Sequence, residues 1–175
     1  TLLEGDAIEA PEAPAREGFA FSGWSNLPAT MPAGDLTIEG GSSTLEYRLT
    51  FLLDGAVFSE TTLTFGAPVF APEAPVREGY TFSGWGELPE LMPAEELTLE
   101  GGYTANLYRL AFLVDGAVVF EESLPYGASV TVPAVEEKPG FAFSGFGEIP
   151  AVMPAEDLTL EGQHTQLLYK LTATV

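Results

Sequence analysis

Three scarcities limit the chemistry of this chain: it has no cysteine, one histidine and few basic residues. Without cysteine there are no disulfides and no thiolate ligands for a metal. A single histidine cannot build a zinc site, and the sequence offers no partners for a histidine-based catalytic triad. No apolar run approaches the ~18 residues of a membrane-spanning helix, so we predict no membrane insertion in this segment.

Only six residues are Lys or Arg against 26 Asp or Glu, which gives a net charge of −20. This negative field repels phosphate backbones, so we predict no nucleic-acid partner. Carboxylate pairs such as Glu95/Glu96 are common in so acidic a chain and do not by themselves indicate glycosidase chemistry. The acidic loops hold glutamate and proline and lack the Asp/Asn-rich pattern of calcium loops. We therefore predict no enzyme activity, no catalytic residue, no cofactor and no metal site.

What the sequence does contain is one stretch that occurs three times, as Gly18–Gly40, Gly79–Gly101 and Gly140–Gly162. The only methionines lie at equivalent positions of the copies, 61 residues apart: Met31, Met92 and Met153. A fixed period of this length indicates tandem supersecondary units. We divide the chain into a partial first repeat (1–46), a second repeat (47–107) and a third repeat (108–168). Residues 169–175 are then the opening strand of a further repeat or a donor strand.

Each full repeat begins with a predicted β-hairpin. The first strand is Tyr47–Leu53, which is rich in β-forming residues. Asp54-Gly55 suits a tight turn with positive φ, and the second strand of the hairpin is Ala56–Phe65. The third repeat has the same pattern in Tyr108–Val114 and Ala117–Tyr126. The first repeat lacks the equivalent opening strand.

The second half of each repeat is predicted to be extended and rich in proline. Tyr80–Trp85 alternates aromatic and small residues, and Leu97–Gly101 with Tyr103–Asn106 form a last strand that runs almost directly into the next repeat. No segment of ten or more residues has a helical period. We predict an all-β or β-rich fold of tandem units with almost no linkers, and hence stiff joints and an elongated rod.

The basic residues fall in two columns of the repeat, one of which is Arg16, Arg77 and Lys138, and the other Arg48, Arg109 and Lys170. One interpretation is that both columns are solvated positions that balance nearby carboxylates. The other is that one column pairs across the joint between repeats with the acidic column of Glu39, Glu100 and Glu161. The candidate interaction or joint residues are thus Arg48, Arg109, Lys170, Glu39, Glu100, Glu161 and Tyr103.

One aromatic position recurs in the three copies, as Trp24, Trp85 and Phe146. Phe can replace Trp where no N–H partner is needed, so we predict a core position rather than a carbohydrate platform. The methionines are predicted to fill gaps in the core. His164 has no counterpart in the other repeats and is predicted to lie at the surface.

The order of these features resembles the Listeria–Bacteroides repeat of bacterial surface proteins, also called the internalin B-type B repeat. The matching residues are Phe65-Gly66, Pro72, Pro75, Gly79–Trp85 (GYTFSGW) and Leu97–Leu99, and Phe146 departs from the usual Trp. The resemblance covers essentially the whole chain. It implies β-grasp (ubiquitin-like) units in tandem on exported proteins, which act as spacers or adhesion modules rather than enzymes.

Three functional hypotheses follow. The first is a structural stalk or spacer of a secreted or cell-surface bacterial protein, whose partners are other domains of that protein or other copies of itself. The second is an adhesin-type module that binds a glycan or protein of a host or microbial community through residues such as Tyr80, Tyr103 or Trp85. The third is a subunit of a head-to-tail extracellular filament, in which Tyr169–Val175 completes the first repeat of another molecule.

Overall fold

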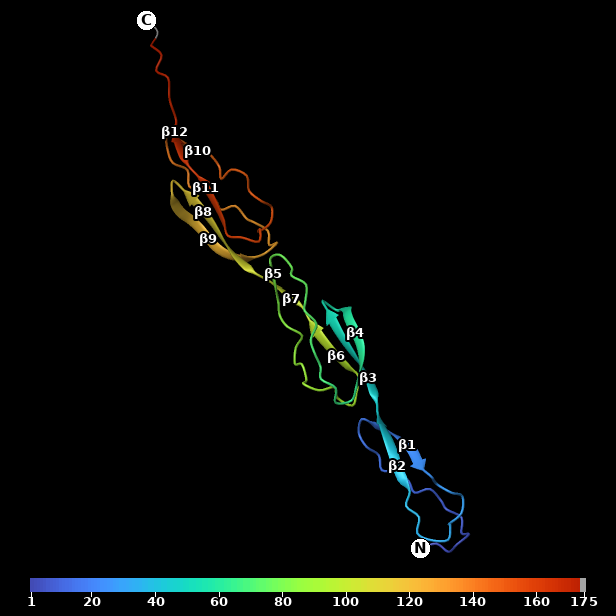
Figure 1. Cartoon of the computed structure of the whole chain (residues 1–175). Helices are drawn as coiled ribbons and strands as arrows, with labels where there is room; N and C mark the ends of the chain where they lie inside the picture. Colours follow the sequence, from blue (N-terminus) through green and yellow to red (C-terminus); the bar gives the residue numbers. More distant parts are fainter. Residues whose placement is uncertain (174–175) are drawn as a thin grey trace. The chain divides into compact units, whose positions relative to one another are not determined.

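The computed structural model describes residues 1–173, so the last two residues of the predicted strand Tyr169–Val175 lie outside the described residues. The described chain forms twelve β-strands arranged in small sheets and has no α-helix, which confirms the predicted all-β fold (Figure 1). Residues 1–173 therefore include no helix long and apolar enough to cross a membrane.

The chain divides into two compact units, which we describe separately. Unit 1 consists of Thr1–Glu73 and Gly84–Gly102, and unit 2 consists of Ala74–Ser83 and the chain from Tyr103 on. The second repeat therefore contributes Ala74–Ser83 to unit 2 and most of its other residues to unit 1.

The main sheet of unit 2 has three strands in the order β11-β8-β9. β8 (Leu107–Val114) and β9 (Ala117–Pro125) form an antiparallel hairpin. Its turn residues Asp115 and Gly116 have φ values of 51° and 82°, as a tight turn of the primed kind requires. β11 (Leu158–Gly162) lies parallel to β8 on its other side. The first and last strands of the main sheet in this repeat are thus neighbours.

Unit 1 contains the same sheet in the order β4-β3-β6. β3 (Glu46–Leu53) and β4 (Ala56–Thr64) form the hairpin, and β6 (Leu97–Gly101) pairs in parallel with β3. Both hairpins confirm the sequence prediction. The β-grasp assignment remains a prediction, because in both units irregular chain connects the hairpin to the parallel strand.

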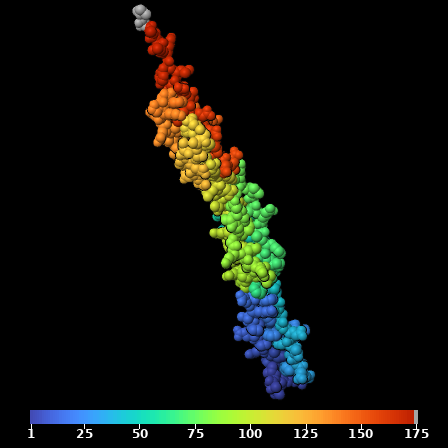
Figure 2. Space-filling model, turned by 90° about the vertical axis from the view of Figure 1, so that its left-hand side faces the viewer, coloured from blue at the N-terminus to red at the C-terminus, as the bar shows by residue number. Residues whose placement is uncertain are grey.

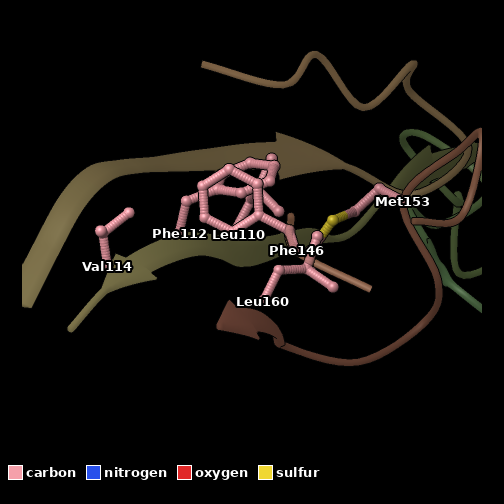
Figure 3. Close-up of a cluster of buried hydrophobic side chains, with 6 residues drawn as sticks. All are labelled: Leu110, Phe112, Val114, Phe146, Met153 and Leu160. Carbon is pink, nitrogen blue, oxygen red and sulfur yellow. The ribbon is translucent and has the colours of Figure 1, made fainter. Parts of the chain in front are cut away.

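The core of unit 2 lies on one face of this sheet and is drawn in Figure 3. Successive inward positions of β8 supply Leu110, Phe112 and Val114, because alternate residues of a strand share a face. The ring of Phe146 meets that of Phe112 edge-on, with 4.8 Å between the centroids. Met153 and Leu160 complete the buried cluster. Each buried side chain of this size contributes roughly 1.5–3 kcal/mol relative to exposure.

Unit 1 buries the equivalent residues of the second repeat: Leu49, Phe51, Trp85, Met92 and Leu99. Trp85 and Phe146 are each only 6% exposed, which confirms the predicted core position. Met92 and Met153 are fully buried, as the gap-filling interpretation requires.

Three two-stranded ribbons accompany these sheets. β5 (Tyr80–Phe82) pairs with β7 (Tyr103–Ala105), and β10 (Phe141–Phe143) pairs with β12 (His164–Gln166). The ribbon of the first repeat is longer. There β1 (Phe19–Ser25) pairs with β2 (Glu39–Thr44) through a bulge, and Glu39 lies opposite Ser25.

Candidate functional site

The most distinctive recurring geometry is the joint at which one repeat meets the next, and in unit 2 it is built around Gly79. The ring of Tyr126, just past the end of β9, lies directly on this glycine. A Cβ at position 79 would lie 2.3 Å from Cγ of Tyr126, so only glycine fits. Its φ of 76° also favours glycine. The Tyr126 ring meets the Tyr80 ring edge-on at 5.5 Å.

Two backbone hydrogen bonds fix this joint. The amide of Asn106 donates to the carbonyl of Gly79 at 2.8 Å, and the amide of Tyr126 donates to the carbonyl of Asn106 at 2.9 Å. Asn106 is also the single residue between β7 and β8. The last ribbon of one repeat and the hairpin of the next are therefore connected without a linker.

Unit 1 repeats this geometry between Gly18 and Phe65. A Cβ at Gly18 would lie 2.3 Å from the Phe65 ring, which meets the Phe19 ring edge-on at 5.8 Å. The amide of Leu45 donates to the carbonyl of Gly18, and the amide of Phe65 donates to the carbonyl of Leu45, both at 2.8 Å. The joint therefore has the same sequence pattern in both copies. A glycine followed by an aromatic residue contacts the aromatic residue of an aromatic-Gly pair in the next hairpin.

In the third repeat the equivalent glycine, Gly140, has no aromatic ring packed on it. Gly140 has a φ of 78°, and its carbonyl accepts a hydrogen bond from the amide of Leu167 at 2.8 Å. A Cβ at Gly140 would meet nothing within 4 Å. A cavity of about 460 Å³ opens beside it, lined among others by Lys138, Phe141 and His164.

The first column of basic residues stacks on the aromatic residue of each joint. The guanidinium carbon of Arg16 lies 3.9 Å from the centroid of the Phe19 ring, and that of Arg77 lies 4.1 Å from the Tyr80 ring. In the third repeat Nζ of Lys138 lies 4.5 Å from the Phe141 ring. The 61-residue spacing identified this column, but it could not show that the cations lie on aromatic rings.

The second column forms ion pairs at the surface. Arg48 lies 2.9 Å from a carboxylate oxygen of Glu96, and Arg109 lies 2.7 Å from one of Glu121. The hydrogen bond from Arg109 also lowers the pKa of Glu121. The side chains are roughly half exposed, so each pair is worth ~0–1 kcal/mol.

The structure thus pairs these two arginines with carboxylates outside the predicted acidic column. The members of that column are exposed residues of three different strands, β2, β6 and β11: Glu39, Glu100 and Glu161. Lys170 is exposed after the last strand.

Tyr103 and the tryptophans have structural partners. The hydroxyl of Tyr103 donates to the carbonyl of Pro75, and its half-buried ring lies 5.6 Å from the Phe82 ring. The indole N–H of Trp85 donates to the carbonyl of Pro72 at 2.8 Å, and Trp24 donates to Pro11 at 2.9 Å. Sequence reasoning missed these bonds. With Trp85 buried, a carbohydrate platform loses its best residue.

His164 corrects a prediction. The sequence predicted a surface position, but the His164 side chain is only 8% exposed and packs beside Phe143. Its amide donates to Oδ1 of Asp115 at 2.8 Å, and its Nδ1 lies 2.9 Å from Oδ2. The backbone hydrogen bond from His164, followed by that from its ring, lowers the pKa of Asp115. The sequence held no signal for this contact, because the residues are 49 positions apart and no other repeat has a histidine there.

Within residues 1–173 no three His, Asp or Glu side chains are grouped so that they could hold a metal ion. The recurring features are instead packing contacts between β elements. The fold and the joints define a tandem β-repeat protein.

Comparison with known families places the chain more closely. Residues 1–38 and 47–99 match the Listeria–Bacteroides repeat domain, and the chain belongs to this family. It is 29% identical over 126 residues to internalin H of Listeria monocytogenes, an alignment that covers 61% of this chain. Two proteins of Evansella cellulosilytica, whose names describe them as membrane proteins, are 29% and 26% identical over 159 and 162 residues, covering 79% and 81% of the chain. The alignments span 23% of internalin H and 24% and 19% of the two Evansella proteins, so each relative is far longer than the matched region.

Proposed function

We propose that this chain is a structural spacer in the repeat region of a secreted or cell-surface bacterial protein and that it performs no catalysis. The observation that carries the proposal is the repeated joint. An aromatic ring packed on glycine, two backbone hydrogen bonds and a single connecting residue leave little slack between one repeat and the next. In a chain built in this way, the position of one repeat restricts the position of its neighbour.

The relatives support the location. Internalin H and the two proteins named as membrane proteins each contain a matching region within a much longer chain. We propose that the present repeats likewise serve other domains of one surface protein and hold them away from the envelope. The net charge of −20 suits this role, because like-charged surfaces repel and keep the protein soluble.

Small-angle scattering of the purified chain, extrapolated to zero concentration, tests the spacer role. A compact globule of this length would have a radius of gyration of about 16 Å. We expect a clearly larger value, and a value near the compact one would contradict the proposal. Lengthening the joint by inserting Gly-Ser-Gly-Ser after Asn106 supplies the comparison. If the native joint is stiff, the insertion broadens the distribution of interatomic distances, whereas an insertion at the exposed turn after Gly116 leaves it unchanged.

A further inference from the structure

The ribbon β1–β2 of the first repeat and the loop before it border a pocket. Its volume is about 370 Å³, and its wall includes Pro14, Arg16, Phe21, Trp24 and Ser42. Phe21 and Ser42 are direct partners in the ribbon, and the Trp24 ring meets the Phe21 ring at 5.2 Å. Both segments are drawn in shades of blue in Figures 1 and 2. A volume of this size is usual for pockets that bind small ligands, which range over roughly 300–1,000 Å³.

The second repeat shows which group fits this place. Tyr103 takes the position of Ser42 in the repeat and lies opposite Phe82. Its ring meets the Phe82 ring at 5.6 Å, and its hydroxyl donates to the carbonyl of Pro75. The guanidinium carbon of Arg77 lies 5.6 Å from the centroid of the Tyr103 ring. A tyrosine ring therefore has three partners here: an aromatic ring, a carbonyl and a cation.

The first repeat has the same three partners around the pocket. Phe21, Pro14 and Arg16 are equivalent to the ring, carbonyl and cation partners of Tyr103, and all three line the pocket. Ser42 has no ring to place between them. The pocket therefore lies where the second repeat holds a phenol.

Two hydrogen bonds hold the loop of the first repeat as they do in the second. The indole N–H of Trp24 donates to the carbonyl of Pro11 at 2.9 Å, and the amide of Phe19 donates to the carbonyl of Arg16 at 3.1 Å. The equivalent bonds of the second repeat measure 2.8 and 3.1 Å. Pro14 lies between these two bonds, and the loops APEAPAREG and APEAPVREG differ at one residue. Its carbonyl is therefore placed as that of Pro75 is.

A pocket also opens at this place in the third repeat. There the cavity of about 460 Å³ is lined by residues at equivalent positions, His164 among them. In that repeat the β8–β9 hairpin is in place and Phe146 is buried in the core. In the first repeat the following hairpin is in place, and Phe65 packs on Gly18. The pocket is open in both settings, so it is a feature of the ribbon and its loop.

We propose that the pocket of the first repeat binds the p-hydroxyphenyl group of a ligand, in the place that Tyr103 occupies in the second repeat. The ring packs against Phe21 and beside the guanidinium of Arg16, and its hydroxyl donates to the carbonyl of Pro14. The ligand is a free phenol or the side chain of a tyrosine in a partner protein, since both carry this group. Such recognition goes beyond the spacer role and is compatible with it.

The contacts of the pocket select this group among others. A guanidinium within about 6 Å of an aromatic ring is attracted to its face, which favours an aromatic over an aliphatic ligand. A hydroxyl donor pairs with the carbonyl of Pro14, which favours a phenol over a plain phenyl group. The net charge of −20 repels anions, which favours an unmodified phenol over a phosphorylated one.

Titration of the isotope-labelled chain with p-cresol, followed by amide chemical shifts, tests the proposal. We expect saturable shifts at the amides of Phe21 and Ser42. The compound 4-methylanisole keeps the ring but has no hydroxyl donor, and it should bind about three- to tenfold more weakly. The absence of shifts at these amides, or equal binding of the two compounds, overturns the proposal.

A matched pair of variants locates the site. Ser42→Tyr fills the pocket with a phenol of the chain itself, as in the second repeat, and should abolish the p-cresol shifts. Ser43→Tyr adds the same group on the opposite face of β2, because successive residues of a strand point to opposite faces, and should bind as the native chain does. Both serines are exposed. Binding that persists in Ser42→Tyr, or that is lost in both variants, overturns the proposal.

The reciprocal variant Tyr103→Ser opens the equivalent pocket in the second repeat. In this variant p-cresol should shift the amide of Phe82 in addition to those of the first repeat, and it should raise the melting temperature more than it does for the native chain. If the folded variant shows no new shift, the equivalence of the two places is wrong and the proposal fails.

Two small peptides distinguish the sources of the phenol. Tighter binding of Gly-Tyr-Gly than of p-cresol assigns the pocket to a tyrosine side chain, and binding of p-cresol that is at least as tight assigns it to free phenols. Gly-Phe-Gly is the control, and binding equal to that of Gly-Tyr-Gly overturns the proposal. These results do not depend on the spacer role, which small-angle scattering tests separately.

Discussion

The ring of Tyr126 occupies the space in which a side chain at Gly79 would begin, with 2.3 Å between its Cγ and the position of a Cβ. The same relationship holds between Phe65 and Gly18, one repeat earlier. Because an aromatic ring cannot move aside as the end of a flexible side chain can, these glycines are steric requirements of the joint as well as conformational ones.

Gly79→Ala should destabilise unit 2 by about 2–4 kcal/mol, because positive φ costs ~1–2 kcal/mol for an L-residue and the clash with Tyr126 adds to it. Gly140→Ala is the matched control, since Gly140 has nearly the same φ but no atom within 4 Å of its Cβ. It should cost only about 1–2 kcal/mol. Denaturant unfolding measures both, and equal losses would show that the Tyr126 contact is unimportant.

Trp85→Phe tests the indole bond to Pro72. The change keeps an aromatic ring in the core but leaves the Pro72 carbonyl without its donor, so we expect a loss of about 1–3 kcal/mol. Trp24→Phe removes the same bond in a more exposed place and should cost less. Urea titrations followed by circular dichroism compare the two, and a neutral Trp85→Phe would mean that the hydrogen bond contributes nothing.

Asp115→Asn should change how stability depends on pH. The folded state lowers the pKa of Asp115, so its carboxylate stabilises the fold above the unfolded pKa of about 3.9 and loses this effect as pH falls through the lower folded value. Asn accepts the positive φ of this turn, so the backbone is preserved. We expect the melting temperature of the variant to lie below that of the native chain at pH 6 and to approach it near pH 2. Asp35→Asn, at an exposed carboxylate, should show a smaller difference at pH 6.

Met153→Ala should cost about 2–5 kcal/mol, because the side chain is fully buried between β8 and β11 residues of the core. Met31→Ala, the equivalent change in the first repeat, removes a half-buried side chain and should cost less. Hydrogen exchange of unit 1 and unit 2 amides locates each effect. A larger loss at Met31 than at Met153 would contradict the difference in packing described above.

The sequence predicted the local part of this fold well. The β-forming composition of the strands and the Asp-Gly turns placed both hairpins, and Trp85 and Met153 were correctly assigned to cores. These features are encoded within a few residues, or by a 61-residue repeat that shows which positions are equivalent.

What could not be predicted depends on contacts between distant segments. The parallel pairing of β8 with β11 joins residues 48 apart, and hydrophobic alternation alone does not indicate a partner. The burial of His164 depends on Asp115, which lies in the turn of an earlier hairpin. The ring of Tyr126 on Gly79 likewise joins two conspicuous residue types, but their spacing along the chain gave no reason to place them together.

The parallel pairing in each of the two three-stranded sheets has a mechanical consequence. The chain enters the third repeat's sheet at the start of β8 and leaves it at the end of β11, and the two strands are held by five residue pairs in register. Tension applied between these two points acts along the strands, so it loads the ladder in shear and strains its hydrogen bonds together rather than unzipping them one after another. A protein that must withstand flow or traction while anchored at one end would gain resistance to rupture from this arrangement.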